Sequence, residues 1–190
     1  MAFSKNRLFT QSGDAADGAR RVRALPLIWV LGKCMQDVAA DRARIVAPPP
    51  VVYLGILGLG LFLEWLWPTR LLSWSLAVGV GLAILVCGVI GLAAAIRTIW
   101  RAQTPIDPYK ATTALVTDGL FRFSRNPIYV SDTLIYVGLS LALNAWWALA
   151  LTPVLVWMMR VGVIAREEEY LERKFGDDYF RYKRQVRRWL

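Results

Sequence analysis

The chain has 190 residues, of which 56% are hydrophobic, and its mean hydropathy of +0.40 is too high for an ordinary soluble domain. Its apolar residues lie in long runs, which is the pattern of membrane-spanning helices. The net charge of +9 lies between these runs, so anionic membrane lipids, rather than nucleic acid, are the expected partners.

Two features of the composition limit which catalytic and metal-binding groups the chain can offer. The sequence contains no histidine, which removes the commonest general base and the commonest metal ligand. The two cysteines, Cys34 and Cys87, fall in different apolar segments without CxxC spacing. Neither a metal site nor a structural disulfide is therefore expected.

The first 50 residues precede the long apolar runs. Residues 1–20 are rich in Ser, Gly, Asp and Ala, which predicts a disordered leader, and they hold no apolar core of a cleavable signal peptide. Residues 21–50 are expected to form an interfacial amphipathic helix and a linker, because the run Ala24–Leu31 is too short to span a bilayer. Residues 51–190 are then one membrane domain.

Four apolar runs in this domain predict an all-α, polytopic membrane protein with about four transmembrane helices, followed by a charged helical tail over residues 166–190. The predicted spans are Val51–Trp67, Leu72–Ile96, Pro127–Leu143 and Trp147–Ile164. The second span carries small residues at four-residue spacing, a pattern that lets helices approach closely. These residues are Ala83, Cys87, Gly91 and Ala95.

The distribution of basic residues predicts the orientation. Residues 20–50 carry six Lys and Arg, residues 97–126 five and residues 160–190 nine, whereas the other two turns carry only Arg70. This bias places both termini on the cytoplasmic side of the inner (cytoplasmic) membrane. The polar connection 97–126 and the tail then lie on the same side, where they can close over one ligand.

The segment 119–131 brings two arginines to the start of the third span. Pro127 lacks an N–H group and disfavours helical backbone at Asn126, so a helix is predicted to begin at Pro127. The free N–H groups of that helix start, together with Arg122 and Arg125, form a receptor for a carboxylate or a phosphate. The alternative is that each arginine only anchors the span on the cytoplasmic side.

Two motifs resemble the integral-membrane methyltransferases, which include the isoprenylcysteine carboxyl methyltransferases and the phosphatidylethanolamine N-methyltransferases. The first motif comprises Leu-Val-Thr-Asp-Gly-Leu-Phe-Arg at 115–122 and Arg-Asn-Pro-Ile-Tyr at 125–129. The second comprises Glu167, Glu168, Leu171, Phe175, Gly176, Tyr179 and Tyr182. The resemblance covers roughly residues 104–182, and it departs at Asn126, where many members have histidine.

The resemblance implies a methyltransferase domain over residues 51–190 that binds S-adenosylmethionine (SAM) on the cytoplasmic side, releases S-adenosylhomocysteine and needs no metal. The expected cofactor-binding residues are Leu115, Gly119, Arg122, Arg125, Asn126, Pro127, Tyr129, Glu167 and Glu168. The expected catalytic residues are Tyr129, Asp132 and Glu168. Arginines suit the carboxylate of SAM, and glutamates suit its ammonium and its ribose hydroxyls.

Asp132 indicates which substrate is favoured. Placing an acidic residue inside an apolar span costs free energy, so a functional role is its default interpretation. Asp132 would attract an amine headgroup, so N-methylation of phosphatidylethanolamine is the leading hypothesis, with Asp132 or Glu168 accepting the proton of the amine. The alternative within the class is carboxyl O-methylation of a prenylated cysteine, or methylation of another small lipophilic acid or thiol.

Other interpretations of these residues stay open at this stage. Asp132 could pair with Arg125 or cap the third span, and the adjacent glutamates could form a solvated helix face. Tyr179 and Tyr182, with the basic segment Lys183–Arg188, could lie on anionic lipid. A non-catalytic membrane scaffold or a small transporter is the alternative from a different class. The sequence indicates no obligate protein partner.

Overall fold

The structure is a computed structural model that describes residues 46–69, 72–105 and 112–189. The predictions for the leader and for most of residues 21–50 lie outside this part. Within the described residues all regular secondary structure is helical, apart from one isolated bridge between Ser124 and Arg187. The all-α prediction is thus confirmed for this part of the chain.

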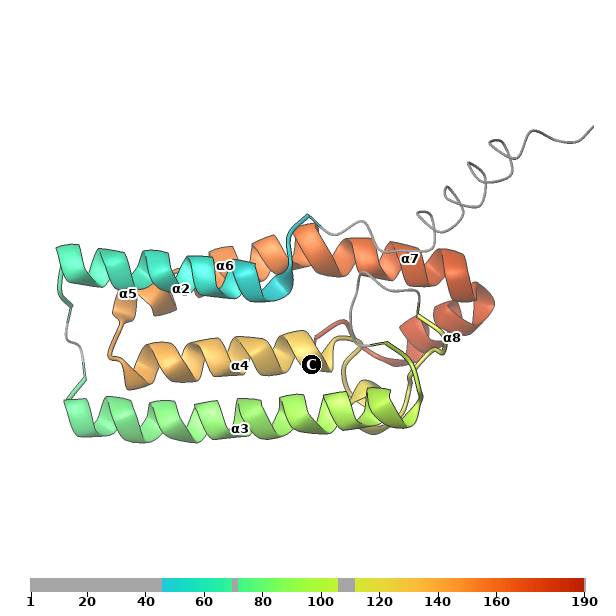
Figure 1. The fold of residues 1–190 in the computed structure, drawn as a ribbon, viewed down its shortest axis with the longest axis horizontal. Coiled ribbons are helices and arrows are strands. Elements are labelled where there is room, and N and C mark those ends of the chain that lie inside the picture. The colour runs from blue at the N-terminus through green and yellow to red at the C-terminus, as the bar shows by residue number, and fades with distance from the viewer. Residues whose placement is uncertain (1–45, 70–71, 106–111, 190) are drawn as a thin grey trace, which may run out of the picture. The chain divides into compact units, whose positions relative to one another are not determined.

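The membrane domain contains two long helices and several shorter ones (Figure 1). The elements are α2 (Pro49–Leu66), α3 (Trp74–Arg101), η1 (Gly119–Arg122), α4 (Pro127–Ala142), α5 (Trp146–Ala150), α6 (Thr152–Met159), η2 (Arg160–Ile164), α7 (Ala165–Phe175) and α8 (Asp177–Gln185). Helices α2 and α3 are long and apolar enough to cross a membrane, whereas the apolar α4 has only 16 residues.

The segment predicted as the fourth span is divided into α5, α6 and the π-helical turn η2. A proline separates α6 from α5. Pro153 has no N–H group and its ring clashes with the carbonyl four residues earlier, so a new helix begins at Thr152. The polypeptide then continues through η2 into α7.

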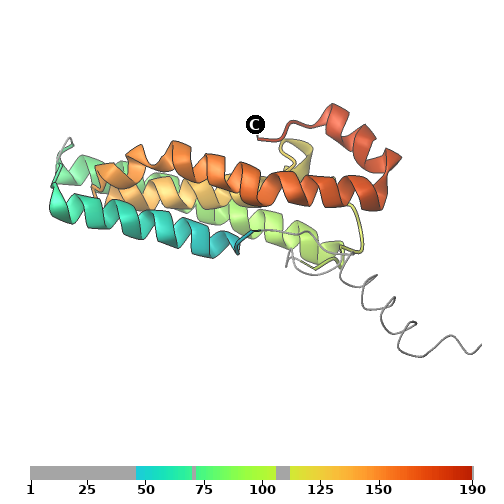
Figure 2. The same cartoon turned by 90° about the horizontal axis from the view of Figure 1, so that it is seen from above.

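Helix α4 lies between α2 and α3, and α6 runs beside α2 (Figures 1 and 2). Glycines let α3 and α4 pack closely, because a Cβ atom on Gly138 would lie 2.5 Å from the backbone nitrogen of Leu85. A Cβ atom on Gly81 would lie 2.3 Å from the nitrogen of Ala142. Within the predicted stripe of small residues, Ala95 is buried, whereas Ala83 and Cys87 are exposed.

A buried cluster joins α2, α4 and the α5–α6–η2 run. It comprises Tyr53, Tyr129, Tyr136, Ala145, Ala148, Leu155, Met159, Val163 and Ile164. Two of its tyrosines donate hydrogen bonds to backbone carbonyls. Tyr53 donates to the carbonyl of Tyr129 at 3.1 Å, and Tyr136 donates to the carbonyl of Ala148 at 2.6 Å. This cluster holds the start of α4 in place beneath the site.

Candidate functional site

The start of α4 is fixed as the sequence predicts. The helix begins at Pro127, and Asn126 precedes it with non-helical backbone. Asn126 is buried, and its backbone N–H donates to the Ser124 hydroxyl at 3.2 Å. Its side-chain amide donates to the carbonyl of Arg188 at 3.1 Å. The asparagine therefore joins the start of α4 to a segment 62 residues away in the sequence.

A pocket of about 270 Å³ lies where the connection after α3, the start of α4 and helices α7 and α8 meet. It collects most of the residues that the sequence analysis singled out. The predicted site residues that line it are Leu115, Arg125, Asn126, Pro127, Tyr129, Asp132, Glu167 and Glu168. Their roles toward a ligand remain predictions, but the chain brings them to one place.

Two of the predicted site residues do not line this pocket. Arg122 is exposed at the end of η1. Gly119 has a φ of +60°, and a Cβ atom there would lie 2.8 Å from the Thr98 hydroxyl oxygen, so the turn against α3 requires glycine. In this structure Gly119 supports the connection, and Arg122 faces outward.

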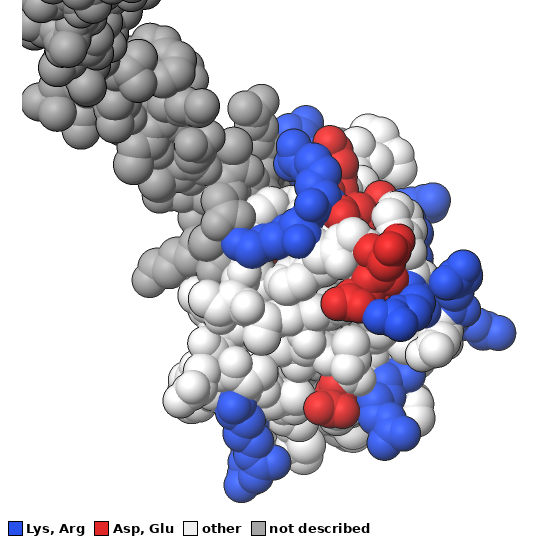
Figure 3. Space-filling view, turned by 90° about the vertical axis from the view of Figure 1, so that its right-hand side faces the viewer, with Lys and Arg blue, Asp and Glu red and all other residues white. Residues whose placement is uncertain are grey.

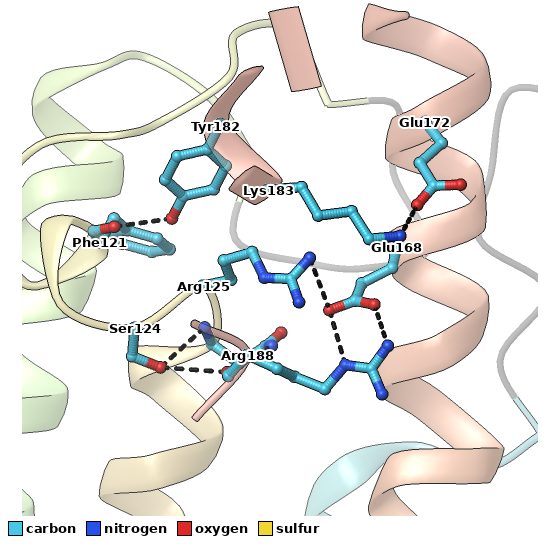
Figure 4. Close-up of polar contacts among 9 residues, drawn as sticks. Phe121, Ser124, Arg125, Glu168, Glu172, Tyr182, Lys183 and Arg188 are labelled. Carbon is cyan, nitrogen blue, oxygen red and sulfur yellow. Dashed lines mark hydrogen bonds and ion pairs between the residues drawn. The ribbon is translucent and has the colours of Figure 1, made fainter. Parts of the chain in front are cut away.

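Arg125 is the most unusual side chain of the pocket (Figure 4). Only 9% of the side chain is exposed, and its Nε and Nη1 atoms are buried without a hydrogen-bond partner among the described residues. The nearest acid is Glu168, whose Oε1 atom lies 3.5 Å from Nη1. Buried donors normally find hydrogen-bond partners, and beyond the ion pair with Glu168 these two nitrogens have none among the described residues.

Glu168 is held by a different arginine, Arg188 (Figure 4). Arg188 donates from Nε to Oε1 at 3.0 Å and from Nη2 to Oε2 at 2.6 Å. The Glu168 side chain is 6% exposed, and its hydrogen bonds raise the pKa of Arg188 above the usual range. In the sequence Arg188 entered only the alternative in which the basic segment Lys183–Arg188 lies on anionic lipid, so its contact with Glu168 was missed.

Arg188 reaches Glu168 because residues 186–189, here called the strap, fold back from α8 against the start of α4. The backbone N–H of Arg125 donates to the carbonyl of Arg187 at 2.9 Å. The Ser124 hydroxyl donates to the carbonyl of Arg188 at 3.2 Å, and Trp189 packs against the buried cluster. No local sequence pattern predicts that the strap pairs with residues 124–126, which lie more than 60 residues earlier in the sequence.

Glu167 faces the pocket beside Glu168. Its carboxylate accepts a hydrogen bond from the Tyr129 hydroxyl at 2.9 Å. Burial raises the pKa of Glu167, the hydrogen bond from Tyr129 opposes this shift, and the charge of Glu168 adds to it. The π-helical turn η2 lies just before α7 and changes the register of the glutamates by one residue, or about 100° around the helix.

Asp132 lies on α4, one turn beyond the helix start. Among the described residues no hydrogen bond or ion pair engages its carboxylate, so neither pairing with Arg125 nor capping of α4 explains it. The side chain lines the pocket and also an apolar groove between α2 and α4. The groove residues include Pro50, Tyr53, Leu54, Leu57, Ile135, Tyr136 and Leu139.

Tyrosines of α8 close the pocket from the other side. Tyr179 is 1% exposed and Tyr182 is 7% exposed, so neither lies on lipid, and that interpretation is wrong for both. The Tyr182 hydroxyl donates to the carbonyl of Phe121 at 2.7 Å, and burial raises the pKa of Tyr182 to about 12. These contacts hold α8 against the connection that follows α3.

Charged side chains of both signs surround this end of the domain (Figure 3). Lys183 pairs with Glu172 between α8 and α7, and Arg181 pairs with Asp178 on the surface. The Arg181–Asp178 pair is exposed and screened by water, so it contributes little to stability, whereas the Lys183–Glu172 pair is half-buried. The buried charges of the pocket are the ones that need a specific explanation.

Comparison with known proteins gives a consistent picture. A family model described as phospholipid methyltransferase matches residues 75–178. The protein-S-isoprenylcysteine O-methyltransferase of Schizosaccharomyces pombe is 33% identical over 72 residues, which cover 38% of this chain and 30% of that protein. An uncharacterized protein of Haemophilus influenzae is 50% identical over 62 residues, which cover 29% of this chain and 98% of that protein. No solved structure matches. Together these findings support a membrane methyltransferase.

Proposed function

The chain belongs to the phospholipid methyltransferase family, and we propose that it uses SAM to N-methylate the amine headgroup of phosphatidylethanolamine-type phospholipids. One observation carries the proposal: the pocket combines an anion receptor with carboxylates. Arg125 presents buried donors without a hydrogen-bond partner among the described residues, and Glu167 and Glu168 line the same pocket. A ligand with both a carboxylate and an ammonium, such as the amino-acid part of SAM, is complementary to this arrangement.

The residues present fit SAM as a cofactor. Arg125 would pair its carboxylate, Glu167 would hold its ammonium and ribose hydroxyls, and backbone near Leu115 would meet the adenine. Glu168 would add negative charge beside the ammonium while its oxygens stay hydrogen-bonded to Arg188. When bound, SAM supplies a methyl group on a sulfonium, with a neutral thioether as the leaving group. The protein's contribution is therefore alignment and exclusion of water, and the Tyr129 hydrogen bond supports it by orienting Glu167.

Asp132 is proposed to select the amine substrate. Its carboxylate has no partner among the described residues, and it lies where the pocket meets the apolar groove. A lipid amine arriving from the groove would be attracted as an ammonium and would pass its proton to Asp132 before it attacks the methyl group. Glu168 is the alternative proton acceptor, but Arg188 already occupies both of its oxygens.

We further propose four membrane passes, formed by α2, α3, α4 and the α5–α6–η2 run. Two of these helices meet the length and hydropathy of a span, and the basic residues of 97–126 and 160–190 support a cytoplasmic pocket in the inner membrane. In this arrangement the groove between α2 and α4 opens toward the bilayer, which suits lateral approach of a lipid.

A methyl-transfer assay tests the proposal. Purified protein in detergent would be given methyl-labelled SAM with phosphatidylethanolamine vesicles and, in parallel, with a farnesylated cysteine analogue. Label in methylated phospholipid is the expected result. Label only in the cysteine ester would contradict the substrate assignment and favour carboxyl O-methylation, the activity that the name of the Schizosaccharomyces pombe relative states.

A result without label in either substrate needs one further measurement. If S-adenosylhomocysteine also fails to bind, the methyltransferase proposal is wrong and a scaffold or transporter becomes the better account. If it binds, the SAM site stands and the substrate is another small lipophilic molecule.

A further inference from the structure

We infer that Arg188 is a positioning residue that keeps the guanidinium of Arg125 free for the ligand by occupying both oxygens of Glu168. This inference rests on the proposed function, because the ligand group in question is the carboxylate of SAM. It adds a residue from outside both sequence motifs to the site.

Arg188 and Arg125 compete for the carboxylate of Glu168. Two guanidiniums lie beside Glu168, and they are not equivalent. Arg188 makes two hydrogen bonds to it, at 3.0 and 2.6 Å, whereas Nη1 of Arg125 stays 3.5 Å away without a hydrogen bond (Figure 4). Two-point pairing of arginine with a carboxylate is the strongest arrangement available to either of them.

Without the side chain of Arg188, Arg125 would be the only described arginine beside Glu168 in this site. Its side chain is about as buried as that of Glu168, and the two already form an ion pair at 3.5 Å, but buried donors without hydrogen bonds remain costly. Without Arg188, Arg125 would lower its free energy by moving closer and hydrogen bonding to Glu168. Its donors would then no longer face the pocket, and a ligand carboxylate would have to break that pair.

Contacts of the strap with the start of α4 and with the buried cluster hold Arg188 in place. The strap is fixed at three points: the Arg125 N–H donates to Arg187, Ser124 and Asn126 donate to Arg188, and Trp189 packs on the buried cluster. The segment that carries Arg125 is thus bonded to the strap that carries Arg188. One folded unit sets both guanidiniums, so Arg188 keeps its place while a ligand binds.

The test measures binding rather than turnover. S-adenosylhomocysteine and 5′-methylthioadenosine share the adenine and ribose, but only the first has the carboxylate and ammonium. Calorimetric titration would compare both ligands on the intact protein, on Arg188→Ala and on Arg187→Ala. Arg187 is the matched control, because it removes the same charge from the strap but its side chain is exposed.

For Arg188→Ala we expect S-adenosylhomocysteine to bind about 10- to 100-fold more weakly, as for loss of charged hydrogen bonds. 5′-Methylthioadenosine should bind as before, and Arg187→Ala should leave both affinities unchanged. Equal weakening of both ligands by Arg188→Ala would overturn the inference, since that result is typical of a merely structural defect. So would an unchanged affinity for S-adenosylhomocysteine.

Arg188→Lys keeps the test decisive if the alanine variant does not fold. Lysine retains the charge but cannot pair with both oxygens as a planar fork, so a smaller loss confined to S-adenosylhomocysteine is expected. If Arg188→Lys bound S-adenosylhomocysteine as tightly as the intact protein does, or lost affinity for both ligands alike, the inference would be contradicted. Failure of the intact protein to bind S-adenosylhomocysteine would instead contradict the proposed function.

Discussion

The two ends of the helical domain handle buried polar groups in opposite ways. At the end away from the pocket, Glu64 accepts hydrogen bonds from the turn residue Thr69 and from the backbone of Trp147. Asn144 donates to the carbonyl of Leu72 at 3.3 Å and accepts from the Trp146 indole at 2.9 Å. The contacts of Glu64 with Trp147 and of Asn144 with Leu72 link segments far apart in the sequence, so this end is structural.

At the pocket end the partners are incomplete. Arg125 has two buried nitrogens without a hydrogen bond, and Asp132 has an unengaged carboxylate, within the part of the chain that is described. Buried polar groups without partners cost free energy, and proteins keep them where something else supplies the partner. The difference between the ends separates residues that hold the fold from residues whose missing partner we propose to be a ligand.

Arg125→Ala should have the largest effect, because it removes the proposed receptor for the ligand carboxylate. We expect S-adenosylhomocysteine to bind at least about 30-fold more weakly, as when a buried charge loses its partner. Calorimetric titration in detergent would measure it, with Arg187→Ala as the control. An affinity within about twofold of the intact protein would show that Arg125 is structural, like the polar residues at the other end.

Asp132→Asn should separate substrate chemistry from cofactor binding. We expect methylation of the lipid amine to fall about 10- to 100-fold, less than a general base usually contributes because Glu168 remains as an alternative acceptor, with the affinity for S-adenosylhomocysteine unchanged. Initial rates with phosphatidylethanolamine vesicles and titration of the same preparation would test this. Equal losses of rate and affinity would mean that Asp132 supports the fold and does not select the substrate.

Glu64→Ala should affect stability alone. It leaves the donors of Thr69 and Trp147 without their acceptor, at a cost of about 1–3 kcal/mol. Thermal unfolding in detergent should therefore shift down by several degrees, while ligand affinity per folded molecule stays the same. Glu64→Gln, which keeps an acceptor oxygen, should retain most of the stability. A loss of ligand affinity in the alanine variant would blur the distinction between the two ends.

Glu167→Gln should have the smallest effect on stability, and one that depends on pH. Burial raises the pKa of Glu167, so the intact protein loses stability as pH rises from the usual glutamate range through the raised value. Glutamine removes this cost and can still accept from Tyr129. The variant should melt about 2–4 °C higher at pH 8, the shift that ~1 kcal/mol produces in a chain of this size. A gain that is larger at pH 4 than at pH 8 would contradict the assignment.

Local chemistry made much of this molecule predictable. Pro127 marks the start of α4 because a proline lacks the donor that a helix interior needs, and Gly176, with a φ of +50°, ends α7. Apolar runs of sufficient length indicated α2 and α3. The resemblance carried by the motif around Arg125 and the glutamate pair, with the charge bias that puts both on one side, predicted most of the residues that meet at the pocket.

Other features depend on tertiary contacts that no local pattern records. Arg188 looks like one more basic residue after α8, and only the pairing of the strap with residues 124–126 places it beside Glu168. Small residues recur throughout α3, so spacing alone did not distinguish the exposed Cys87 from Gly81, which faces α4. The π-helical turn η2 likewise has no sequence signature.

An experimental structure of the protein bound to S-adenosylhomocysteine would test the central claim most directly. The measurement is the distance from the ligand carboxylate to the guanidinium of Arg125. Our account predicts that the carboxylate lies within hydrogen-bond distance of Nε or Nη1, while the pair between Arg188 and Glu168 stays intact. A ligand whose carboxylate lies elsewhere, with the Arg125 nitrogens still unpaired, would contradict it.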